Sequence, residues 1–226
     1  MSKFYQTSVA QRRTPARIDA GPCLVSMRAL FPVRAALAAD DIIEMLVLPA
    51  DCVLVDAVLD ASDLDSGTTP ALAYDVGLMS GPVGLSDLNR SVGAELFSGA
   101  TTGQAAGMAR ASLRSAVAQL ASDKNRSIGI KIGTAAATAT VSATDGTNDR
   151  GFWEPNMAYA AGDYITLPNG LRVACTTAGT SGVAMPLEAL SSAVKGGTVA
   201  DGTVTWTHQD PYLALTITYR SVDNGL

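Results

Sequence analysis

Charged residues are scarce in this chain of 226 residues. Asp, Glu, Lys and Arg make up 16% of it, hydrophobic residues make up 47%, and the formal net charge is −5. A folded protein with so few charges leaves much of its surface neutral, which suits contacts with other proteins. Nucleic-acid binding is not expected, because nucleic-acid binders present clustered basic residues and a positive balance.

Residue types that carry catalysis or bind metals are also rare. His208 is the single histidine, and Cys23, Cys52 and Cys175 lie far apart without a C-x-x-C pair. A nucleophilic triad would need His208 as its base, but no G-x-S-x-G turn accompanies it. A structural zinc site needs four ligands, and phosphate-binding glycine motifs are absent. We therefore expect no enzyme, no cofactor and no metal, with the cysteines reduced and buried.

One acidic group leaves two interpretations open. Asp60, Asp63 and Asp65 precede Gly67 in a spacing that partly matches a calcium loop, but the later bidentate Glu of such loops is missing. Short carboxylates at a strand end more often bond to nearby backbone groups in a turn. We favour the turn.

Long apolar runs are missing as well. The longest apolar stretch, residues 42–59, is interrupted by Glu44, Pro49, Asp51 and Asp56, so we expect no membrane-spanning helix. The first twenty residues contain no apolar core, so we expect no signal peptide.

Short apolar runs separated by turn residues dominate the rest of the chain. The runs rich in Val, Ile and Leu are 23–29, 42–48, 53–59, 71–78, 127–132 and 213–219. This pattern predicts a mainly β fold, a β-sandwich or barrel-like main domain over residues 23–147 and 210–226. Residues 104–121 repeat Ala and Leu at helical spacing and predict one short helix.

The segment 148–209 has a different texture and predicts a small inserted β-module. Its Asn169-Gly170 pair indicates a hairpin. Its aromatic residues have two interpretations: they build the core of the module, which we favour, or they form a platform that stacks on polysaccharide. They are Trp153, Tyr159, Tyr164 and Trp206.

Residues 1–22 predict an extended N-terminal arm. The first twenty residues hold four basic residues against Asp19, and the arm ends at Pro22. Arginine and aromatic residues are enriched at protein interfaces, so the arm is a candidate for docking on an acidic protein surface. The candidate interface residues are Phe4, Tyr5, Arg12, Arg13 and Arg17.

Residues 40–84 resemble the small structural proteins encoded beside the capsid genes of tailed bacteriophages, including decoration (cement) proteins. The similarity lies in Asp41-Ile42-Ile43-Glu44, Leu48-Pro49-Ala50, residues 59–68 and residues 75–81, and it continues at 97–99, 128–130 and 215–220. It implies a homotrimer on the capsid exterior of a virion, made in the bacterial host cytoplasm, that binds the major capsid protein and bridges neighbouring subunits.

Segment 148–209 resembles a module found in phage tail fibres, through Trp153-x-Pro155, Tyr159-x-x-Gly162-Asp163, residues 175–182 and residues 201–206. It is distantly similar to small chitin- and cellulose-binding modules. This resemblance implies an alternative function, a glycan-binding virion or tail component that acts through the inserted module.

Overall fold

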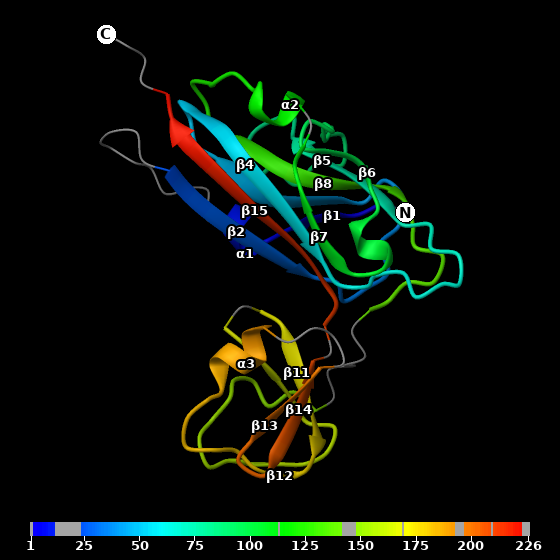
Figure 1. Ribbon diagram of the computed structural model, residues 1–226, viewed down its shortest axis with the longest axis vertical. Coiled ribbons are helices and arrows are strands. Elements are labelled where there is room, and N and C mark those ends of the chain that lie inside the picture. The colour runs from blue at the N-terminus through cyan, green and yellow to red at the C-terminus, as the bar shows by residue number, and fades with distance from the viewer. Residues whose placement is uncertain are drawn as a thin grey trace. The chain divides into compact units, whose positions relative to one another are not determined.

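The chain forms two compact units in a computed structural model that describes residues 2–11, 24–112, 114–141, 148–168, 170–192, 197–208 and 210–222. Unit 1 comprises Met1–Phe31, Ala36–Thr140 and Leu213–Leu226, and unit 2 comprises Pro32–Ala35 and Val141–Tyr212 (Figure 1). Unit 2 contains the whole of segment 148–209. No helix in the described ranges is long and apolar enough to cross a membrane.

The first sheet of unit 1 has the order β1-β3-β8-β5-β6. Its strands are β1 (Phe4–Gln6), β3 (Ile42–Leu48), β8 (Arg126–Thr134), β5 (Ala73–Leu78) and β6 (Phe97–Ala100). β1 runs parallel to β3, and the other pairs are antiparallel. Every residue of β3 is buried, because both faces of this strand are covered.

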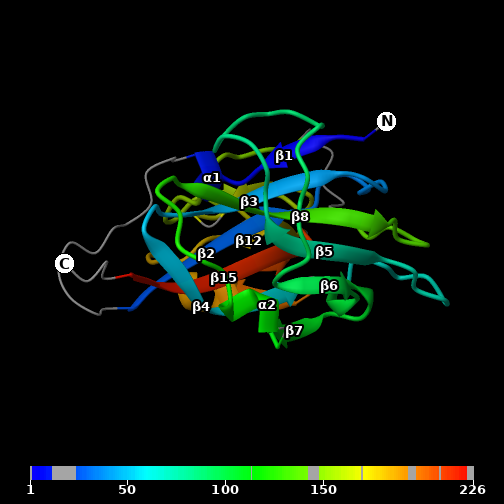
Figure 2. The ribbon, with the colours of Figure 1, turned by 90° about the horizontal axis from the view of Figure 1, so that it is seen from above.

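The second sheet of unit 1 has the order β2-β15-β4-β7. Its strands are β2 (Leu24–Pro32), β15 (Tyr212–Ser221), β4 (Cys52–Ala61) and β7 (Gly107–Arg110). Alternate residues of β15 are fully buried, namely Leu213, Leu215, Ile217 and Tyr219. Thr216 and Thr218, which lie between buried residues, are more exposed. This alternation marks a sheet with one face on a core. The two sheets lie face to face (Figures 1 and 2), so the predicted mainly β, sandwich-like fold is confirmed.

The predicted helix over residues 104–121 is wrong. The region instead holds a 3-10 turn η1 (Thr102–Gln104), strand β7 and a single helical turn α2 (Arg114–Val117). Ala106 has a φ of 57° and Gly107 a φ of 151°, which stop a helix at its start. β7 pairs with β4, so contacts at the edge of the second sheet outweigh the local preference for a helix.

Residues 4–10 pack within unit 1 and do not form the start of a free extended arm. The hydroxyl of Thr7 donates to Met45 O and accepts from Ala10 N, and both Thr7 and Ala10 are buried. They belong to α1 (Ser8–Gln11) and the turn before it. The sequence did not indicate that residues 4–6 pair with β3. A strand of three residues is too short to show an apolar period.

Unit 2 is a small β-module. Its main sheet has the order β10-β11-β14-β13, with β10 (Tyr164–Thr166), β11 (Arg172–Thr177), β14 (Val204–His208) and β13 (Thr198–Asp201). β9 (Ala158–Tyr159) pairs with β12 (Gly179–Thr180), and α3 (Leu187–Ser192) is its helix. β10 and β11 form the predicted hairpin, in which Leu167 N donates to Leu171 O and Gly170 has a φ of 85°.

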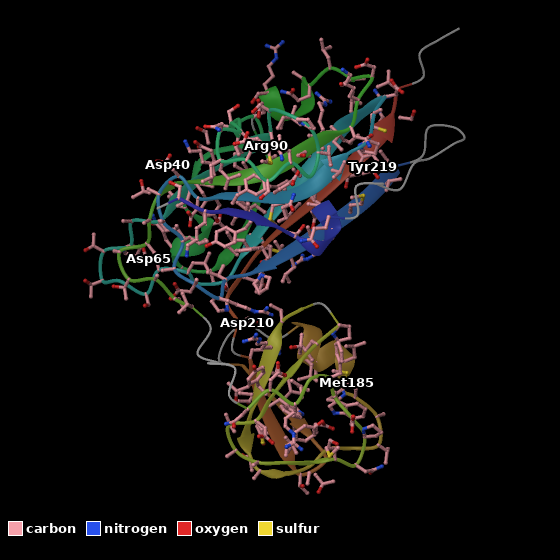
Figure 3. All side chains as sticks on the ribbon, turned by 180° about the vertical axis from the view of Figure 1, so that it is seen from behind. Asp40, Asp65, Arg90, Met185, Asp210 and Tyr219 are labelled. Atoms are coloured by element: carbon pink, nitrogen blue, oxygen red, sulfur yellow. The ribbon has the colours of Figure 1, made fainter. Side chains whose placement is uncertain are left out.

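Asp65 joins two loops at one end of unit 1 (Figure 3). Its buried carboxylate accepts five backbone N–H groups, from Gly67, Ala71, Leu72, Ala137 and Thr138. Burial alone would raise the pKa of Asp65, but these donors outweigh it and hold the pKa well below its ordinary value. The carboxylate therefore acts as the predicted turn former, on a larger scale than a local turn.

A buried carboxylate on β3 anchors the long connection between β5 and β6, residues 79–96, which we call the strap. Glu44 and Arg90 are both buried, with 3.2 Å between Glu44 Oε1 and Arg90 Nη1. Arg90 also donates to the carbonyl oxygens of Ser80 and Leu85, and Gly84 N donates to Glu44 at 3.1 Å. The strap thus lies on the first sheet, crossing in front of β3 and β8 in Figure 2.

Glycines make room for the strap. Glu44, Gly129 and Gly77 occupy one row across β3, β8 and β5. A Cβ on Gly77 would lie 2.4 Å from Gly93 O, and one on Gly129 would lie 2.5 Å from the sulfur of Met79. Any side chain on these two glycines would therefore displace the strap.

The Glu44–Arg90 pair yields a stability prediction. Burial alone would raise the pKa of Glu44, but four donors lower it: Ser127, Gly84, Gln6 and Arg90. The change Glu44→Gln leaves Arg90 buried without a counter-charge, so we expect the free energy of unfolding to fall by about 3–5 kcal/mol. Chemical denaturation followed by circular dichroism measures this.

The matched control is Asp63→Asn, an exposed carboxylate in the same unit, which we expect to cost less than about 0.5 kcal/mol. The double change Glu44→Leu with Arg90→Met should recover part of the loss, since it removes both charges. An unfolding free energy equal to that of the wild type in Glu44→Gln would contradict the anchoring role.

Candidate functional site

The described residues contain no cluster of His, Cys, Asp and Glu able to hold a metal ion. Cys52 and Cys175 are buried, and burial raises the pKa of Cys175, which keeps it a thiol. Cys23 lies outside the described residues. The Cys175 thiol is therefore not an activated nucleophile.

Two of the five predicted interface residues lie in β1. The Arg90 guanidinium lies 5.7 Å from the ring centroid of Phe4, and the Tyr5 ring lies 5.3 Å from that of Phe31 in β2. Both aromatics are half-buried and pack within unit 1, so they do not project from a free arm. Arg12, Arg13 and Arg17 lie outside the described residues.

Three of the four predicted platform residues lie in the interior of unit 2. Tyr159, Tyr164 and Trp206 are buried, and the rings of Tyr159 and Trp206 meet edge to face with centroids 4.8 Å apart. These three form no exposed platform. They serve as the core of the module, which was the favoured interpretation, because a small β-module has few other large residues to bury. Trp153 alone among the four remains partly exposed.

Asp201 organises this aromatic core, and the sequence analysis missed it. Its buried carboxylate accepts the indole N–H of Trp153 at 2.7 Å, that of Trp206 at 2.9 Å and the backbone N–H of Gly182 at 2.8 Å. The tight turn at Gly202, with a φ of 61°, keeps this carboxylate close to the 179–182 loop. The Asp-Gly pair signals the turn in the sequence, but not which side chains the Asp meets.

Several large apolar side chains are exposed, and sequence reasoning singled out none of them. Unit 1 presents Leu85 and Leu88 on the strap and Met108 on β7, the last with 72% of its surface exposed. Unit 2 presents Phe152, exposed by 72%, and Val183, exposed by 82%.

The sandwich of unit 1 has two flanks where sheet edges end. β1 and β2 are the outermost strands of their sheets at one flank, where Tyr5 and Phe31 touch. β6 and β7 are outermost at the opposite flank, and Figure 2 shows β1 and β6 at opposite margins. A hollow of about 290 Å³ lies at the β6/β7 flank, lined by residues 96–102, Ala109 and Ser112.

His208 is a structural residue of unit 2. It lies buried on β14, and its Nε2 has no hydrogen-bond partner within the described part of the chain. Burial lowers the pKa of His208, and the opposing effects of Asp210 and of the bond to the Leu190 backbone are smaller. His208 is therefore neutral at pH 7 and lacks the setting of a general base.

The lowered pKa of the buried His208 predicts that the stability of unit 2 depends on pH. The unfolded chain binds a proton at His208 near pH 6.5, while the folded chain binds it only at lower pH, so unit 2 loses stability as the pH falls below about 6.5. Because His208 is the single histidine, its NMR imidazole signal reports the folded pKa directly. His208→Gln should abolish this part of the pH dependence of hydrogen exchange in unit 2; a folded pKa at or above 6.5 would contradict the assignment.

No protein-family model and no curated protein sequence matches the chain. Among solved structures, a chain in the capsid of Ralstonia phage GP4 matches with a TM-score of 0.63 and 27% identity, over 98% of this chain and 99% of that chain. A chain of the cyanophage Pam1 capsid asymmetric unit matches with a TM-score of 0.48 and 15% identity, over 96% of this chain and 98% of that chain. The full-length match to the GP4 capsid supports a bacteriophage capsid-related protein with a structural role in the virion.

Proposed function

We propose that this chain is a capsid decoration protein, which binds the outer surface of a phage capsid and bridges neighbouring subunits of the major capsid protein. The observation that carries the proposal is the match to a chain of the GP4 capsid, which extends over both units. A similarity confined to unit 2 would have fitted a shared adhesive module, whereas this one includes the sandwich of unit 1.

The mechanism is mechanical. A chain that binds the assembled shell but not its free subunits stabilises the shell by mass action, because binding energy is gained only when the shell is intact. This role needs a rigid scaffold and an extended neutral surface, and it needs no reactive group. The buried Glu44–Arg90 pair and the five bonds to Asp65 supply the rigidity, and the low charge content supplies the surface.

The N-terminal arginines are the proposed contact with the shell. Phe4 and Tyr5 are held in unit 1 by β1, so the part of the predicted arm left for the shell begins after α1. Arg12, Arg13 and Arg17 follow within six residues of one another. Three guanidinium groups on a short segment fit an acidic patch through paired hydrogen bonds.

We further propose that the protein acts as a homotrimer and that unit 2 is a module attached to the sandwich. The chain enters unit 2 after β8 and leaves it through β14 into β15. Both flanking strands pair within unit 1, β8 with β3 and β5, and β15 with β4. The sheets of unit 1 therefore include residues of unit 2 only at two strand ends, Pro32 of β2 and Tyr212 of β15.

The shell contact is tested by binding of purified protein to shells assembled from the major capsid protein of the same phage. We expect the wild type to co-sediment with shells at a copy number close to that of the shell subunits. The triple change R12S, R13S and R17S should lower the affinity at least tenfold, because we propose that these arginines contact the shell, and the melting temperature should stay within a few degrees of the wild type. Raising the salt concentration should weaken wild-type binding, since exposed charges are screened.

The matched control replaces three arginines elsewhere on the surface, R110S, R150S and R220S, which should leave the affinity unchanged. Wild-type protein that fails to co-sediment, or that is present in virions at only a few copies, would overturn the decoration role. Equal affinity of the triple variant would overturn the role of the arginines alone.

The modular role of unit 2 gives a further prediction. Replacing residues 148–209 with a short Gly/Ser linker should leave unit 1 folded, because loop-closure free energy changes slowly with length, by about 1 kcal/mol here. Calorimetry should show the unit 1 transition within a few degrees of its wild-type position, and shell binding should persist. A variant that is insoluble, or whose remaining transition falls by more than about 10 °C, would show that unit 1 depends on the module.

A further inference from the structure

We draw no further inference here: the strongest candidate, the hollow at the β6/β7 flank of unit 1 with its uncharged lining and the exposed Met108 beside it, carries nothing because no feature of the described residues shows what covers it.

Discussion

The buried ion pair between Glu44 and Arg90 is the constraint on which the architecture of unit 1 depends. Glu44 lies on a strand whose seven residues are all buried, where a carboxylate is costly unless its oxygens are fully bonded. The Glu44 oxygens accept hydrogen bonds from Gln6 of β1, from Ser127 of β8, and from Gly84 and Arg90 of the strap. One carboxylate thereby joins the N-terminal strand, the centre of the first sheet and its cover.

The two glycines beside Glu44 follow from the same constraint. Because the strap must approach the sheet closely enough for Arg90 to reach Glu44, the neighbouring positions on β8 and β5 hold Gly129 and Gly77, where a Cβ would collide with the strap. The strap then presents Leu85 and Leu88 on a held backbone. Because this backbone is already held, its exposed side chains lose little conformational entropy when another protein binds them, which suits a structural protein of a shell.

Unit 2 also uses a buried carboxylate, that of Asp201, to hold separate segments together. Asp201 holds two indole rings and a loop amide, and Asp65 in unit 1 holds five loop amides. In each case a buried acid binds loop residues, and Asp201 also binds Trp206 of β14. Aromatic residues make up only 5% of the chain, and carboxylates fixed by N–H donors help the apolar core to hold both units together.

The sequence by itself determined the main strands and the change of texture after residue 147. Val, Ile and Leu runs between turn residues marked β3, β4, β5, β8 and β15, because strands of a sandwich alternate or bury both faces. The hairpin at Gly170 and the turn role of Asp65 were also predictable from local chemistry. Residues 107–110 were not, since the free edge of β4 outweighed their helical spacing.

The tertiary structure alone decided the candidate surfaces. The sequence favoured a core over a platform for Tyr159, Tyr164 and Trp206, and packing places all three inside unit 2. Phe4 and Tyr5 were expected in an extended arm, but β1 pairs with β3. The hollow beside β6 and β7 has no local signature in the sequence, and neither does the place of β2 at the margin of its sheet. They arise from which strands end up outermost in two sheets, and that order is set by contacts between residues far apart in the sequence.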